Sequence, residues 1–213
     1  MPFNPINPAS KLDAVNQILM ASGDARVTTI TDSPLLQVND AVEIIEATTR
    51  EVLSSPWHFN TDTEYSLSYD TDSGSDTYKM VLIPTRAITV DATYPYKDFV
   101  MRFDTDNDVF ALYDKDKHTF EIEEDVKADI VWSYQFEQVP DLIRYYIFVR
   151  AARKYQAARI GSATLYEFTM RDEQEARNAA RRADGSSADG NLLTGCVETN
   201  WIWQRTRNPI RYR

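Results

Sequence analysis

Residues 38–69 read VNDAVEIIEATTREVLSSPWHFNTDTEYSLSY, and the spacing of the hydrophobic residues changes within this stretch. In its first half, apolar residues recur every three or four positions, which is typical of one buried face of a helix. After Pro56 the spacing becomes two, because Tyr65, Leu67 and Tyr69 alternate with polar neighbours as in a half-buried strand. The sequence therefore predicts a helix that ends at Pro56 and is followed by a β region.

Two helices are predicted before this β region. The first begins at Ser10, which with Asp13 resembles a capping box, and ends at Ser22-Gly23. The second begins at Ser33-Pro34, a capping residue followed by the helical position that tolerates proline. The predicted apolar faces are Leu12, Val15, Ile18 and Leu19 in the first helix and Val38, Ala41, Val42, Ile45, Thr49 and Val52 in the second.

The β region, residues 60–137, is predicted to be an antiparallel insertion between helical segments. The residues at 70–76 have the composition of a turn or loop. Strands are predicted around 65–69 and at 78–83, 99–103, 109–113, 119–122 and 128–136.

Two further helices are predicted after the β region. Pro140 opens the third, and Gly161-Ser162 separates it from a fourth that runs from Ala163 to Ala183. Residues 184–190, DGSSADG, have the composition of a flexible linker. The predicted inner face of the third helix is Leu142, Tyr145, Tyr146, Val149, Ala152, Tyr155 and Gln156, and the predicted i,i+4 pairs of the fourth are Glu167/Arg171 and Glu173/Arg177.

These elements predict an α+β fold, in which a bundle of about four helices carries an inserted antiparallel β domain and an extended C-terminal arm. The predicted units are residues 1–59 and 138–185 for the two helical pairs, 60–137 for the β domain, and 186–213 for the linker and docking arm.

Charge is unevenly distributed along the chain. The 213 residues include 23 Lys+Arg and 33 Asp+Glu, a net charge of −10. This balance argues against a surface that grips nucleic acid, because phosphate binding requires Lys and Arg, but it permits a surface that DNA slides past. Residues 60–130 hold 17 acidic and 7 basic side chains, whereas residues 139–184 hold 6 and 9. The two parts are therefore expected to face different surroundings.

Cysteine and membrane signals are sparse. The single cysteine, Cys196, excludes an internal disulfide and fits a reducing cytoplasm. We expect no signal peptide and no membrane span, because the apolar runs are too short for either. We also expect no metal and no cofactor, since one cysteine and two distant histidines cannot form a zinc site and no phosphate-binding glycine motif is present.

Three patterns keep enzymatic or metal chemistry open as an alternative. A catalytic triad would need His58 or His118, for which packing or capping is the simpler interpretation. Residues 104–108, DTDND, begin like a calcium loop, but Val109 stands where glycine is needed and Lys115 where a bidentate Glu is needed, so an acidic hairpin is favoured. The carboxylates available for glycoside hydrolysis are Glu121, Glu123, Glu124, Asp125 and Asp129.

The segment from Asn191 to Arg213, called here the arm, is predicted to dock on a partner. Trp201 and Trp203 project to the same side of an extended segment, and Trp and Arg are enriched at binding hot spots. A tail that folds back on its own core and a DNA-binding tail are the alternatives. The candidate docking residues are Trp201, Trp203, Arg205, Arg207, Arg211 and Arg213.

The ordered series of motifs resembles tail tubular protein A, the adaptor family of short-tailed, podovirus-type bacteriophages. The order of elements, with a β domain inserted into a helical bundle, also agrees, and the resemblance covers residues 10–185. The matching segments are 12–19, Ser22-Gly23, 57–60, 129–140, 144–147, 150–156, Gly161 and 173–177.

The resemblance implies a non-enzymatic subunit that forms a dodecameric ring, joins the portal protein to the tail nozzle protein, and leaves a channel for double-stranded DNA. It places the protein in the virion tail, assembled in the host cytoplasm. The arm lies outside the resemblance, and from its residues we expect it to dock on the portal or on a neighbouring subunit. The alternatives are a tail-associated polysaccharide or cell-wall hydrolase and a plug that retains DNA. Because ring contacts join unlike surfaces, the candidate contact residues are Arg171, Arg177, Arg181 and Arg182 against Glu123 and Glu124.

Overall fold

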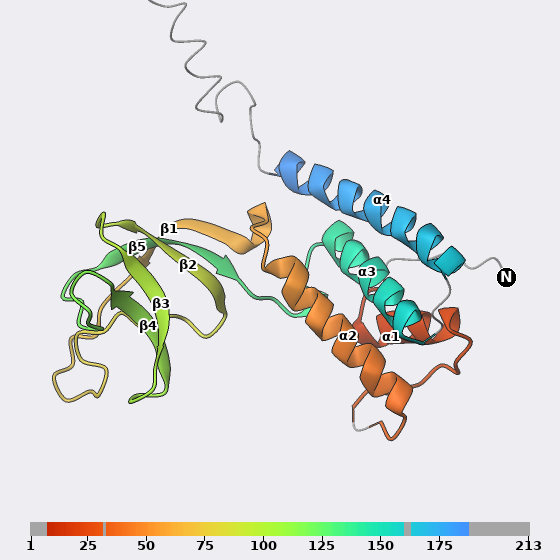
Figure 1. The fold of residues 1–213 in the computed structure, drawn as a ribbon, viewed down its shortest axis with the longest axis horizontal. Helices are drawn as coiled ribbons and strands as arrows, with labels where there is room; N and C mark the ends of the chain where they lie inside the picture. The colour runs from red at the N-terminus through yellow and green to blue at the C-terminus, as the bar shows by residue number, and fades with distance from the viewer. Residues whose placement is uncertain (1–7, 32, 160–162, 188–213) are drawn as a thin grey trace, which may run out of the picture.

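The computed structural model describes residues 8–31, 33–159 and 163–187, with the backbone alone for 163–169. Figure 1 shows an α+β fold, as predicted, with the helices gathered in one part and the strands in another. We call these the helical part and the β part. In chain order the elements are α1 (Lys11–Ala21), α2 (Leu36–Leu53), η1 (His58–Asn60), β1 (Thr61–Leu67), β2 (Ala87–Tyr94), β3 (Phe99–Asp104), β4 (Val109–Asp114), β5 (Val126–Trp132), η2 (Phe136–Gln138), α3 (Asp141–Arg159) and α4 (Ala163–Ser187).

Both predicted ends of α1 are confirmed. The Ser10 hydroxyl accepts the Asp13 N–H at 3.1 Å, and the Asp13 carboxylate accepts the Ser10 N–H at 3.3 Å, which completes the capping box. At the other end, Gly23 adopts a φ of 83°, and the N–H of Asp24 donates to the Leu19 carbonyl at 2.8 Å. This is a Schellman motif, in which glycine avoids the steric cost of a left-handed residue.

The start of α2 differs from the prediction. The helix begins at Leu36, and Leu35 precedes it without a capping side chain. The Ser33 hydroxyl instead accepts the N–H of Leu35 at 3.4 Å, so it closes a short turn ahead of the helix. The predicted apolar face is confirmed at Val38, Ala41, Ile45, Thr49 and Val52, with Val42 half-buried and Thr48 and Leu53 added to the buried set.

The inner face predicted for α3 is partly wrong. The helix begins after Pro140, whose carbonyl accepts the Arg144 N–H at 2.9 Å. Tyr146 and Tyr155 are buried as predicted, but Leu142 is 44% exposed. Because α3 packs against both α2 and α4, more than one of its sides is apolar, and the spacing alone does not select among them. The buried residues are Ile143, Tyr146, Ile147, Phe148, Ala151 and Tyr155, while Tyr145, Val149, Ala152 and Gln156 are half-buried.

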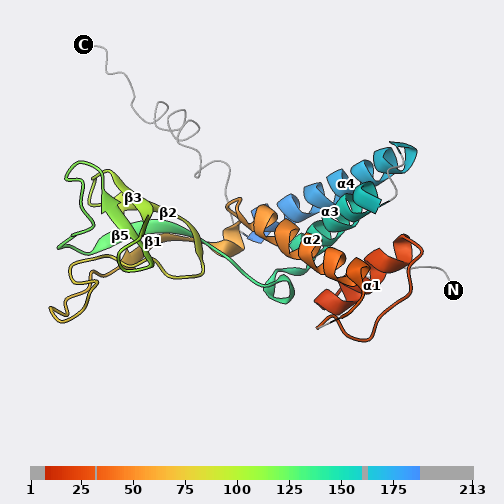
Figure 2. The same cartoon turned by 60° about the horizontal axis from the view of Figure 1, so that its bottom comes forward.

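Helix α4 extends beyond the predicted boundary at Ala183. It continues to Ser187, so the first four residues of the predicted linker are helical, and residues 188–190 lie outside the described part. The Asp184 carboxylate accepts the N–H of His58 at 2.9 Å, which holds this end of α4 against η1. Figures 1 and 2 show α4 and α1 on opposite sides of the α2–α3 pair.

The β part contains a three-stranded antiparallel sheet in the order β1–β5–β2 and a separate ribbon of β3 and β4. The strand β2 was not predicted. The predicted strands at 78–83 and 119–122 form only isolated bridges, such as Leu82 with Ala111 and Met80 with Glu121. The last predicted strand ends at Trp132, and residues 136–138 form η2 instead.

Asn60 joins the two parts at their narrow connection. Its fully buried side chain donates to the carbonyls of Leu53 at 3.0 Å and Trp132 at 3.2 Å and accepts the N–H of Trp57 at 2.8 Å. Each part has its own hydrophobic core, and Ile88 of β2 packs against the core of the helical part. The end of α2, η1 and the end of β5 are therefore fixed to one another.

Candidate functional site

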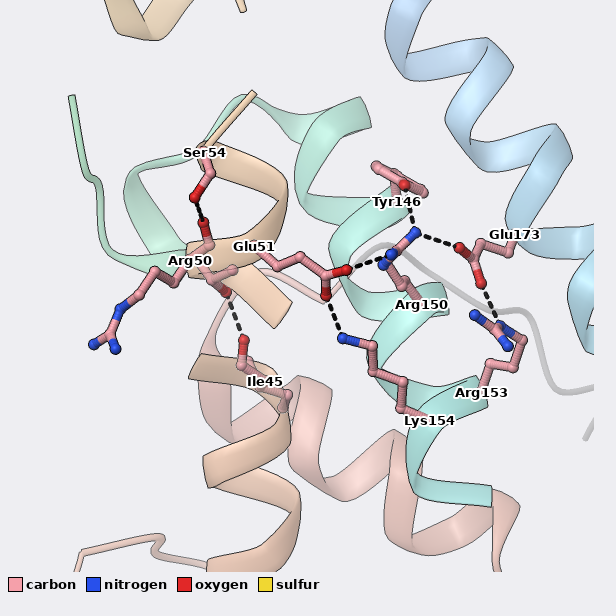
Figure 3. A network of polar contacts seen from close by, with 10 residues as sticks. Ile45, Arg50, Glu51, Ser54, Tyr146, Arg150, Arg153, Lys154 and Glu173 are labelled. Atoms are coloured by element: carbon pink, nitrogen blue, oxygen red, sulfur yellow. Dashed lines mark hydrogen bonds and ion pairs between the residues drawn. The ribbon is translucent and has the colours of Figure 1, made fainter. Parts of the chain in front are cut away.

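A network of charged side chains joins α2, α3 and α4 (Figure 3). Arg150 of α3 donates to Glu173 of α4 at 2.8 Å and also to Glu51 of α2. Lys154 pairs with Glu51, and Arg153 pairs with Glu173. Glu173 is a buried carboxylate, only 7% exposed, so its position depends on these two arginines.

The network keeps Glu51 ionised. Its hydrogen bond to Lys154, followed by that to Arg150, holds the pKa of the Glu51 carboxyl below its ordinary value. The predicted i,i+4 pair of Glu173 with Arg177 does not form, because Glu173 points towards α3. This leaves Arg177 without a hydrogen bond or ion pair to any described residue.

A pocket of about 550 Å³ lies between the C-terminal ends of α2 and α4 and the first half of α3. Trp57 and Tyr146 form an aromatic wall, with ring centroids 6.5 Å apart. Arg177 and Arg181 stand exposed at its edge, and neither is paired with a described side chain. Because Trp57 and Tyr146 are buried in the core of the helical part, the guanidinium groups are what a partner can reach, and they suit a carboxylate. The lining residues include Glu51, Ser55, Trp57, Tyr146, Arg150, Arg177, Arg181 and Asp184.

The four arginines predicted as ring contacts do not form a single surface. Arg182 lines a second groove of about 520 Å³ on the other side of α4, with Tyr145, Val149 and Ala179. Arg171 is exposed. Only Arg177 and Arg181 are brought together, at the aromatic pocket.

The predicted acidic partners lie in the β part. Glu123 pairs with Lys79, whose hydrogen bond lowers the pKa of the Glu123 carboxyl, and Glu124 pairs with Lys97. Such exposed ion pairs contribute little stability, so a partner can replace them at little cost. Within one subunit no described contact joins these glutamates to the arginines of α4.

An apolar patch lies on the β part, centred on Phe103 and Phe110; we call it the Phe110 patch. These side chains are 41% and 50% exposed. Phe103 and Phe110 are cross-strand partners in the β3–β4 ribbon, with ring centroids 5.0 Å apart. A pocket of about 370 Å³ adjoins them, and it is lined by Leu82, Ile83, Pro84, Thr85, Ala87, Met101, Asp108, Val109 and Phe110.

The sequence model of the Tube family, tail tubular protein, matches residues 12–189, most of the chain. The chain belongs to the tail tubular protein family. A search of curated proteins gave no match. The family assigns this tail tubular protein a structural role in a bacteriophage tail and makes it a component of the virion. Among the described residues, no helix has the length and hydrophobicity that crossing a bilayer requires.

The two histidines of the tail tubular protein occupy connecting segments. His58 contacts the end of α4 through its N–H, and its Nδ1 lies 3.4 Å from the Ser187 hydroxyl. His118 is exposed in a turn, with a φ of 55°. His58 therefore lies in the contact between η1 and the end of α4.

The acidic residues of the β part have structural contacts. The Asp104 carboxylate accepts the Asp106 N–H at 3.2 Å and the Asn107 amide at 2.7 Å, as expected of an acidic hairpin. Asp129 accepts the N–H of Glu64 at 2.9 Å. A general acid for glycoside hydrolysis needs a raised pKa, whereas the pKa of Glu123 is lowered. Within the described ranges, no group of three or more His, Cys, Asp or Glu could hold a metal ion.

Several predicted site residues lie outside the described part of the chain. They are Cys196, Trp201, Trp203, Arg205, Arg207, Arg211 and Arg213, and the side chain of Glu167 is also not described. In contrast, the network around Arg150 and the Phe110 patch were not predicted from the sequence. The signal for the patch was the placement of Phe103 and Phe110 on either side of the turn at 104–109, which makes them cross-strand partners.

Proposed function

We propose that this tail tubular protein is the adaptor subunit that joins the portal protein to the tail nozzle protein, as a ring of twelve copies around a channel for double-stranded DNA. It acts without catalysis, and assembly takes place in the host cytoplasm. The proposal is supported by the family and by the division of the subunit into a helical part and an acidic β part.

The observation that carries this proposal is the unpaired arginine surface at the aromatic pocket. A closed ring requires contact between two different surfaces of neighbouring subunits. Arg177 and Arg181 present positive charge beside Trp57, while the 121–125 segment of the β part presents exposed carboxylates. In the ring, Glu123 and Glu124 of one copy face these arginines of the next. Arg171 and Arg182 are further candidates on the same helix.

The proposed units have separate roles. The helical pairs, residues 1–59 and 138–185, build the ring and contact the portal, and the β domain, residues 60–137, contacts the neighbouring copy or the nozzle. The linker and arm, residues 186–213, attach to the portal or to a neighbouring copy. An acidic channel wall would repel phosphates, so that DNA passes without adhering.

The test is the mass and shape of the purified chain, measured by light scattering and negative-stain microscopy with and without its cognate portal. Rings of twelve on the portal are expected. Monomers that ignore the portal would contradict the adaptor proposal.

The arm provides a second test. A chain that ends at residue 190 retains every described element. It should keep the circular dichroism spectrum of the full chain and lose affinity for the portal. Unchanged portal binding by this folded deletion would overturn the role of the arm, while leaving the ring untouched.

A further inference from the structure

We propose that, before assembly, the arm covers the Phe110 patch of its own chain, with Trp201 and Trp203 in the apolar pocket. This inference goes beyond the adaptor role, because it concerns the free subunit before it meets a portal.

The patch is exposed because the apolar face of the β3–β4 ribbon extends past its cover. On one face of the ribbon, Met101 pairs with Leu112 and Phe103 pairs with Phe110. Leu112 is fully buried in the core of the β part, whereas the next pair along the ribbon is about half exposed. Contiguous apolar surface of this kind on a subunit calls for an occupant.

The pocket is a fixed feature of the fold. The N–H of Ile83 donates to the Phe110 carbonyl at 2.9 Å, and the N–H of Leu112 donates to the Val81 carbonyl at 3.0 Å. The 81–83 segment is therefore fixed beside β4, with Leu82 bridged to Ala111. A volume of about 370 Å³ falls within the range of sites that accept large apolar groups.

The arm has a matching order of side chains. In an extended segment, residues 201, 203, 205 and 207 project to one side, which aligns two indoles with two guanidinium groups. The pocket offers matching negative charge, because Asp108 lines it and Asp106 lies two residues earlier in the same turn. Both aspartates are exposed. The indoles thus fill the pocket while Arg205 and Arg207 face these carboxylates.

The arm also begins close enough to the β part to reach the Phe110 patch. The described chain ends at Ser187, whose hydroxyl lies 3.4 Å from His58 Nδ1. His58 is three residues before the start of β1, so the arm begins beside the β part. From there to Trp201 an extended chain spans about 45 Å. The β part, residues 60–137, has the size of a unit with a radius of gyration of about 12 Å. A tether of this kind raises the local concentration of the arm at its own patch above that of any other copy.

The single cysteine, Cys196, allows a direct test in the full chain. A nitroxide attached there should weaken the backbone amide NMR signals of residues 82–87 and 101–110 in a dilute sample without portal. The weakening should disappear when Trp201 and Trp203 are both changed to Ala, and also with Phe110→Ser. Ile202→Ala, on the opposite side of an extended arm, and Tyr96→Ser, a 94% exposed tyrosine of the same part, should leave it unchanged.

Two results would overturn the proposal. One is full signal intensity in the unmodified chain, or weakening that survives the double tryptophan change. The other is weakening in a mixture of nitroxide-bearing chains and isotope-labelled chains without nitroxide, since that would place the arm on a second copy. Because no portal is present, neither result depends on whether rings form.

Discussion

At the scale of single residues, Asn60 satisfies three backbone groups with one amide. The change Asn60→Ala removes these hydrogen bonds at the connection between the helical and β parts. Buried groups would lose their partners, so the free energy of unfolding should fall by about 2–3 kcal/mol. Urea unfolding followed by circular dichroism measures this. Asn178→Ala, at an exposed position of α4, is the matched control, and an equal loss in both variants would refute the role of Asn60.

Glu173 is the corresponding residue for the attachment of α4. Glu173→Ala leaves Arg150 with one carboxylate partner instead of two and takes from Arg153 the carboxylate it pairs with. Both arginines keep some contact with solvent, so the expected loss of stability is about 2–3 kcal/mol, towards the lower end for a broken buried pair. Thermal unfolding measures this loss, with Glu175→Ala as the control. Glu175 is exposed and lies two residues away, so its removal should lower the free energy of unfolding by less than about 0.5 kcal/mol.

Glu51 gives the network a dependence on pH. Its pKa in the folded chain is lowered from 4.5, so its contribution to stability is complete above pH 4.5 and is lost as the pH falls through the lower folded value. Glu51→Gln should therefore flatten the fall of the unfolding free energy below pH 4.5. Because the side chain is half exposed, the loss at pH 7 should stay within about 1 kcal/mol. Urea unfolding from pH 7 to 3 is the measurement, with the exposed Glu43→Gln as control; parallel curves for Glu51→Gln and the unmodified chain would contradict it.

At the scale of elements, two glycines near helix ends differ in backbone conformation. Gly185 lies within α4 and an added Cβ meets no atom, so Gly185→Ala should raise the free energy of unfolding by about 0.5–1 kcal/mol. Gly23 has a φ of 83°, so Gly23→Ala should lower it by about 1 kcal/mol. Thermal unfolding of both variants tests this opposite pair. A destabilising Gly185→Ala would show that α4 does not extend to Ser187.

The elements predicted correctly are those with strong local signals. The capping box at Ser10, the glycine at the end of α1 and the change of period near Pro56 each fix a boundary through contacts a few residues apart. The strand β2 was missed because Ile88 packs against the helical core while Val90 packs against the β core, so its burial follows no simple alternation. Met80, Val81 and Ile83 of the 78–83 segment are buried, yet burial does not specify a hydrogen-bonded ladder.

At the scale of the whole molecule, the sequence predicted the charge of the candidate surfaces but not which side chains meet in the folded chain. Charge asymmetry indicated an arginine surface on α4 and an acidic β part. Arg177 lacks its i,i+4 partner because Glu173 points to α3 rather than along its own helix. Arg150 and Glu51 are 99 residues apart in the chain, and no local pattern links residues so distant. Of the four candidates, Arg177 and Arg181 are the pair that the fold brings together at one pocket, so we choose this pair for a test.

This selection leads to a charge-exchange experiment on the ring. Arg177→Glu with Arg181→Glu should prevent rings from forming on the portal, because like charges would face each other across the proposed interface. Glu123→Arg with Glu124→Arg should prevent them for the same reason. A chain that carries all four changes should regain rings, since the attraction is restored with its signs reversed.

Negative-stain microscopy with cognate portal counts the rings. Circular dichroism confirms that each variant is folded, and light scattering confirms that it is not aggregated. Arg26→Glu, an exposed change in the helical part away from the pocket, should leave rings intact. If either double change alone left rings intact, the pairing of these two surfaces would be excluded. If both abolished rings and the fourfold variant did not regain them, each surface would contribute to assembly through a different partner.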